Sequence, residues 1–194
     1  MNYPLQFSFK IVAIAPQIFV LDASGQTLMY VKQKLFKLKE AINIFADNSQ
    51  STLLYTIGAD RVIDFSARYH LRDADGNDLG SIKRQGMKSL FKSHWDIYSG
   101  EEVTMSVQED NPWIRFLDAL FMQIPLIGML AGYVFHPKYN VTRANGTRVA
   151  QLCKKAALFE GKYELVKHSD LEQTEETRMV LGLLMMMLLQ RSRG

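Results

Sequence analysis

The sequence predicts a mainly β protein, a pseudo-symmetric sheet or barrel, with a buried helix near the C-terminus. Three observations predict this fold class: short apolar runs separated by tight turns, an internal repeat, and the eleven-residue apolar segment Met179–Leu189. The chain has 194 residues, of which 47% are hydrophobic and 22% charged, as expected for a globular protein. We therefore expect a single domain over residues 1–194.

Strand-like runs alternate with turn residues along much of the chain. Ile18–Leu21 and Leu28–Val31 flank the turn-forming residues Asp22–Gly25, which is typical of a strand, a turn and a second strand. Asp75-Gly76 and Asn145-Gly146 each lie between two further candidate strands. Both dipeptides suit the positive φ angles of a type I′ turn, so the sequence predicts a type I′ hairpin at each.

These two turns belong to an internal repeat. Tyr69–Gly76 aligns with Tyr139–Gly146 at an offset of 70 residues. The apolar matches that follow the turn are Leu79 with Val149, Ile82 with Leu152, Trp95 with Tyr163, and Ile97 with Leu165. Matching apolar positions imply that the same side chains face inward in both copies. We therefore expect two similar halves, each a strand, turn, strand, loop, strand unit.

The segment 112–135 interrupts this β pattern. Trp113, Phe116, Leu120 and Phe121 recur at helical spacing, and Pro112 suits a first helical turn. The sequence predicts an apolar, partly helical insertion between the two halves. Its apolar side chains would pack over an end of the fold, enter a membrane interface, or contact another chain.

The apolar segment Met179–Leu189 has the features of a buried helix. Thr174 suits the N-cap, while acidic residues in the first turn and arginines at the far end complement the helix dipole. The segment is apolar on every side, so protein or lipid must surround it. Eleven residues extend roughly 16 Å as a helix, and spanning a bilayer needs ~20 residues. We therefore expect a core helix and not a membrane anchor.

These features together resemble the LURP-one-related family, which shares its fold with tubby C-terminal domains and phospholipid scramblases. The residues that carry the resemblance are Val20-Leu21-Asp22 with Gly25, Val31–Leu38, the Asp75-Gly76 and Asn145-Gly146 turns, and the final helix. The resemblance implies a closed antiparallel barrel of about twelve strands, threaded by the C-terminal helix. It implies no particular function, because such folds carry many functions.

No motif points to an enzyme, a metal or a cofactor. The sequence contains no phosphate-binding GxxxxGK[ST], no GxSxG and no HExxH. A single cysteine, Cys153, excludes a disulfide framework. The position that corresponds to Cys153 in the other copy of the repeat is Lys83, which predicts an outward-facing side chain. Asp73–Asp78 resembles a calcium loop, but its glycine falls at the wrong position for an EF-hand. We therefore expect no catalytic, cofactor-binding or metal-binding residues.

Basic residues cluster in three segments although the net charge is only +3. The candidate residues for binding an anion or a lipid headgroup are Lys32, Lys34, Lys37, Lys83, Arg84, Lys88, Lys154 and Lys155. Such clusters create a field that attracts anions. Alternatively, they are solvated strand faces that protect sheet edges from aggregation.

The favoured hypothesis is a non-catalytic binding or scaffold module that contacts anionic phospholipid headgroups or a protein partner through these basic residues. Trp113, Phe116, Leu120 and Phe121 would add an apolar contact surface. Two alternatives remain open: a structural protein that forms a homo-oligomer through 113–135, and a small-ligand-binding or scramblase-like lipid-handling protein. No nucleic acid is expected, because the basic strands lack interleaved aromatic residues. The N-terminus lacks the pattern of a signal peptide, which favours a cytoplasmic location.

Overall fold

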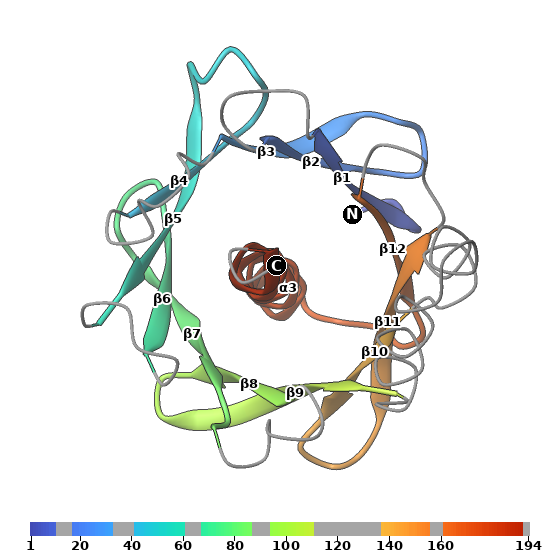
Figure 1. The fold of residues 1–194 in the computed structure, drawn as a ribbon. Coiled ribbons are helices and arrows are strands. Elements are labelled where there is room, and N and C mark those ends of the chain that lie inside the picture. The colour runs from blue at the N-terminus through green and yellow to red at the C-terminus, as the bar shows by residue number, and fades with distance from the viewer. Residues whose placement is uncertain are drawn as a thin grey trace, which may run out of the picture.

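In the computed structural model, the described residues form a closed barrel of twelve antiparallel strands around one helix (Figure 1). The structure describes residues 1–10, 17–32, 41–60, 67–86, 94–110, 137–155 and 161–191. The elements are β1 (Leu5–Lys10), β2 (Gln17–Leu21), β3 (Thr27–Lys32), β4 (Ile42–Phe45), β5 (Leu53–Ala59), β6 (Arg68–Asp73), β7 (Asp78–Arg84), β8 (His94–Ser99), β9 (Glu102–Glu109), β10 (Lys138–Arg143), β11 (Arg148–Lys155), β12 (Gly161–Lys167) and α3 (Gln173–Arg191). The predicted fold class is confirmed.

The strands follow one another around the barrel in sequence order, and β1 closes the barrel by pairing with β12. Each neighbouring pair is antiparallel, so the odd-numbered strands run toward one end of the barrel and the even-numbered strands toward the other. Each of these strands has a partner on both sides. The described sheet thus has no edge, so edge protection does not explain the basic residues of the described strands.

Helix α3 occupies the centre of the barrel (Figure 1). Every residue from Met179 to Leu189 is buried, which confirms the prediction of a core helix. Helix α3 begins at Gln173, one residue before the predicted cap Thr174. A helix that is apolar all round needs apolar neighbours on every side, and the inward-facing side chains of a closed barrel supply them.

Helix α3 packs closely against the wall of the barrel at Gly182. A Cβ atom at this position would lie 3.1 Å from Cδ1 of Ile97 and 3.4 Å from Cδ1 of Ile82. These isoleucines belong to the paired strands β7 and β8 and face the lumen. The missing side chain of Gly182 therefore lets the helix pack directly against this part of the wall.

The predicted repeat is confirmed by the strand registers and extends to a third copy. Tyr69 pairs with Ile82 in β6–β7, and Tyr139 pairs with Leu152 in β10–β11. The equivalent pair in β2–β3 is Ile18 with Val31. In each hairpin the register shifts two residues later, immediately before the turn. The three hairpins lie four strands apart, so the unit recurs at every third of the barrel, and the two copies predicted from the sequence are two of these three.

The turns of the three hairpins share one conformation, which is not the predicted type I′. Gly76 donates from its backbone N to the carbonyl of Asp73, and Gly146 donates in the same way to Arg143. Only the glycines have positive φ, +88° at Gly76 and +85° at Gly146; Asp75 and Asn145 do not. This pattern indicates a type I turn followed by a left-handed glycine that forms a bulge. The hairpins are confirmed, and their predicted turn type is wrong.

Candidate functional site: a basic rim at one end of the barrel

Five of the eight predicted basic residues lie at the ends of strands that run in the same direction. Lys32 is the last residue of β3, Lys83 and Arg84 are the last two of β7, and Lys154 and Lys155 are the last two of β11. Because β3, β7 and β11 are all odd-numbered, these ends lie at the same end of the barrel. We call these five residues the basic rim.

The members of the basic rim are distributed around the barrel and do not form a patch on one side. Strands β3, β7 and β11 are separated from one another by four strand positions in a barrel of twelve. At ~4.8 Å between neighbouring strands, each separation is roughly 19 Å along the wall. The structure therefore places three basic points about one third of a turn apart.

The remaining predicted residues of this site lie outside the described residues. They are Lys34, Lys37 and Lys88, together with the apolar residues Trp113, Phe116, Leu120 and Phe121 and the insertion 112–135. The chain passes through them between β3 and β4, between β7 and β8, and between β9 and β10. The described strand ends that flank all three connections lie at the same end as the basic rim.

The charges of the basic rim are only partly neutralised. Lys155 forms an ion pair with Glu164 of β12, with Nζ and Oε1 2.6 Å apart. Lys32 is exposed, and among the described residues no acid lies within ion-pair distance of Lys32, Lys83 or Lys154. Lys32 and Lys83 point away from the lumen, while Lys154 is on the inward-facing side of its strand. Positive charge is thus available at each of the three points.

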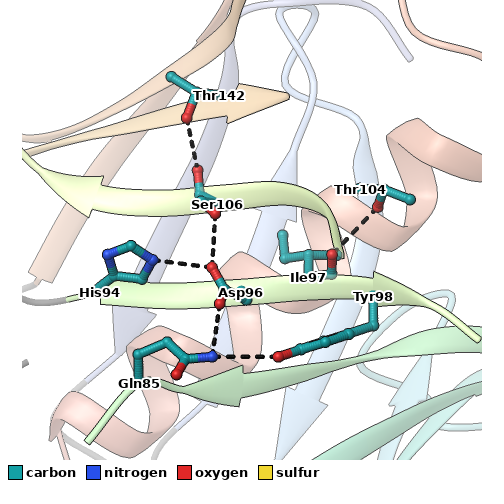
Figure 2. A network of polar contacts seen from close by, with 8 residues as sticks. All are labelled: Gln85, His94, Asp96, Ile97, Tyr98, Thr104, Ser106 and Thr142. Atoms are coloured by element: carbon teal, nitrogen blue, oxygen red, sulfur yellow. Dashed lines mark hydrogen bonds and ion pairs between the residues drawn. The ribbon is translucent and has the colours of Figure 1, made fainter. Parts of the chain in front are cut away.

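A polar network holds β7, β8 and β9 together beside this rim (Figure 2). The buried carboxylate of Asp96 accepts hydrogen bonds from Ser106 Oγ and Gln85 Nε2, both at 2.6 Å. His94 Nε2 lies 3.0 Å from the same carboxylate. Asp96 is opposite Lys83 in the strand register, yet its oxygens bind these neighbours. The network fixes the end of β7 without neutralising Lys83. The network was not predictable from the sequence, because its members meet only through the register of three strands.

The opposite end of the barrel carries acidic turns. Asp22, Asp47 and Asp73 each accept hydrogen bonds from backbone N–H groups within their own hairpin turns. Hydrogen bonds from Ser24, Ser49 and Asn77, respectively, are the largest cause that lowers the pKa of these three carboxyl groups. All three are therefore ionised at neutral pH. The oxygens of Asp73 accept hydrogen bonds from Asp75 and Asn77 within the turn, as the hairpin interpretation of this segment predicts.

One of the bases at this end of the barrel, Arg143, forms an ion pair with an acid. Its Nε and one terminal nitrogen donate to the two carboxylate oxygens of Glu175 at 2.8 and 2.7 Å. The same side chain donates to the backbone carbonyl of Asp170 at 2.8 Å. The pair joins the β10–β11 hairpin to the first turn of α3. It was not predicted, because a contact between residues so distant in sequence depends on how the barrel encloses the helix.

Cys153 does not have the features of a reactive thiol. It lies on the outward side of β11 as predicted, since its neighbour Leu152 faces the core. Burial raises the pKa of the thiol, and this effect exceeds the opposing effect of Lys138 and Lys155. A raised pKa leaves little thiolate at neutral pH, which is the reactive form.

The barrel, its central helix and the basic rim together define a class of protein: a helix-filled β-barrel whose features fit a non-catalytic binding module. The family model for LURP-one-related proteins matches residues 27–166, from the start of β3 into β12. The chain belongs to the LURP-one-related family. The fold shared with tubby C-terminal domains and phospholipid scramblases stays a prediction.

A search of curated proteins gives no match to this chain. Within the described residues, no helix is both long enough and apolar enough to cross a membrane.

Proposed function

We propose that this protein is a non-catalytic binding module that associates reversibly with anionic phospholipid headgroups through its basic rim. The observation that carries the proposal is the position of Lys32, Lys83 and Lys154. They are far apart in sequence and around the barrel, yet their strands end at the same end of the barrel. That arrangement presents three sets of positive charge together to one extended negative surface.

The expected strength of this interaction is modest. A basic residue close to an anionic membrane contributes about 1 kcal/mol. Lys155 is already paired with Glu164, so it adds less than the others. The sum favours reversible binding that weakens with ionic strength, because salt screens charges at the surface.

Vesicle flotation tests the proposal directly. Wild-type protein is expected to float with vesicles that contain phosphatidylserine and not with vesicles of phosphatidylcholine alone. Reversing three charges in Lys32→Glu, Lys83→Glu, Lys154→Glu is expected to reduce binding at least tenfold. Added salt is expected to release the wild-type protein.

A control variant separates the position of the charges from their number. Arg72→Glu, Arg148→Glu reverses two exposed charges at the end of the barrel that holds the hairpin turns. This control is expected to bind anionic vesicles with little loss, and a two-site Lys32→Glu, Lys154→Glu variant matches it in charge. Equal binding to neutral and anionic vesicles, no binding to either, or equal losses in both two-site variants would overturn the proposal.

A further inference from the structure

We infer that the barrel docks end-on to an anionic membrane, with its axis along the membrane normal. It recognises the density of negative charge on the membrane surface and not one particular headgroup. This inference rests on the proposed function and specifies the orientation and the ligand class of the same site. It follows from three features: the spacing of the basic points, the equivalence of the three hairpins that carry them, and the opposite charge at the other end.

The spacing of the basic points is too large for one small ligand. Lys32 and Lys83 are separated by four strands, and so are Lys83 and Lys154, or roughly 19 Å along the wall in each case. The lumen between them holds an α-helix, whose diameter is about 10 Å with side chains. A single headgroup cannot contact all three points, whereas several lipids in one leaflet can.

The equivalence of the three hairpins sets the orientation. Lys32 directly follows Val31 and Lys83 directly follows Ile82, which occupy matching register positions. Lys154 lies two residues after Leu152, the matching residue of the third hairpin. Since strand tilt is shared around a closed barrel, equivalent positions lie at similar heights along its axis. Lys154 lies one residue beyond the equivalent position, roughly 3 Å further along its strand. The three points therefore define a plane that is close to perpendicular to that axis.

The charge at the other end favours the same orientation. The acidic turn residues Asp22, Asp47 and Asp73 lie at the end away from the basic rim, and their lowered pKa values keep them ionised. An anionic bilayer attracts the basic rim and repels the acidic turns. The resulting torque aligns the barrel axis with the membrane normal.

Three matched positions report the orientation. Ala23, Ala74 and Ala144 are exposed and occupy the same place in the three hairpin turns. Each is changed to cysteine in a Cys153→Ser background and labelled with a fluorophore, and Gly86→Cys provides a label beside the basic rim. Quenching by a lipid-borne nitroxide in phosphatidylserine vesicles is expected to be strong at position 86. Quenching is expected to be weak and equal at the three turns. Strong quenching at one turn alone would show side-on docking and overturn the orientation.

A second measurement tests the ligand class. Vesicles that contain phosphatidylserine and vesicles that contain phosphatidylinositol 4,5-bisphosphate, prepared with the same surface charge, are expected to bind the protein equally. Affinity is expected to rise steeply with the fraction of anionic lipid, and soluble inositol trisphosphate is expected not to compete. A tenfold preference for one headgroup at matched charge, or competition by the soluble headgroup, would overturn the inference and leave the proposed function standing. Absence of binding to every anionic vesicle would overturn both.

Discussion

Arg143 and Glu175 form the clearest residue-level link between the barrel and its central helix. Two hydrogen bonds join the guanidinium to both carboxylate oxygens, the bidentate geometry that makes such pairs strong. The side chains retain 30% and 17% of their exposure, so water screens part of the attraction. We therefore expect the pair to contribute about 1 kcal/mol to the free energy of unfolding.

This pair predicts a specific pH dependence. The hydrogen bonds from Arg143 are the main cause that lowers the pKa of Glu175 below its ordinary value of 4.5. A lowered pKa in the folded state stabilises the protein above the unfolded value, and this stabilisation is lost as pH falls through the folded value. Glu175→Gln is therefore expected to lower the unfolding free energy by about 1 kcal/mol at pH 7. Below pH 4.5 its difference from wild type is expected to shrink steadily.

Urea unfolding of the wild type and Glu175→Gln across the acidic range measures this difference. Glu172→Gln serves as the control, because Glu172 lies near the same helix end, whereas the hydrogen bonds of the Arg143 guanidinium go to Glu175 and to the carbonyl of Asp170. A difference for Glu175→Gln that stays constant down to the most acidic folded condition would contradict the assigned role.

The glycine of each hairpin turn illustrates how one backbone angle defines an element. Gly146 has a φ of +85°, and a Cβ atom there would meet nothing within 4 Å. The cost of Gly146→Ala is therefore conformational and not steric, and we expect a loss of about 1 kcal/mol. Gly58→Ala is the matched control, because Gly58 also has open space around it but no positive φ. Thermal or urea unfolding is expected to show a loss of stability for Gly146→Ala only. Equal losses in both variants would contradict a conformational origin of the cost.

Packing between α3 and the wall makes a further prediction for Gly182. Gly182→Leu would place a large side chain where even a Cβ atom lies 3.1 Å from Ile97, and overpacking of this kind costs about 1–3 kcal/mol. Shortening the neighbour in Gly182→Leu, Ile97→Ala is expected to recover part of this loss. A double-mutant cycle measured by urea unfolding gives the coupling. Additive losses would show that the two residues do not compete for the same space.

Local sequence patterns predicted which helices and hairpins form better than they predicted the conformation of the turns. The core helix was predictable because its length, terminal charges and uniform apolarity all lie within one segment. The turn type was not, because an Asx-Gly dipeptide suits a type I′ turn, whereas hydrogen bonds from outside the dipeptide select the type I turn with a bulge. The β2–β3 hairpin was predicted, but not as a third copy of the repeat, because its turn reads Asp22-Ala23-Ser24-Gly25, without an Asx residue directly before the glycine.

At the scale of the whole molecule, closure of the barrel determines what the basic residues can do. The sequence indicated which residues were candidates, but their place around the barrel depends on the number of strands between them. That number follows from pairing over long sequence distances, including β1 with β12. Hence the sequence did not determine where the basic residues lie relative to one another, whereas the structure shows the described ones at three points at one end of the barrel.

Closure also makes the helix and the barrel depend on each other. The inward-facing side chains of the strands are largely apolar and buried, and α3 occupies the space between them. Without the helix, the lumen would expose an apolar wall to water, or the barrel would collapse and lose its register. Without the barrel, Met179–Leu189 would expose a wholly apolar helix. Neither part has another place in the described structure to bury that surface.

Truncation after Glu176 tests this mutual dependence. Each large apolar side chain buried in a core contributes about 1.5–3 kcal/mol, and the deletion removes a central row of them. This loss exceeds the net stability of about 5–15 kcal/mol that a domain normally has. We expect the truncated chain to lose cooperative unfolding and the dispersed amide signals of a folded β protein. Truncation after Arg191 is the control, since it keeps all of α3 and is expected to unfold cooperatively. A soluble, cooperatively folding chain that ends at Glu176 would show that the barrel is stable without its helix.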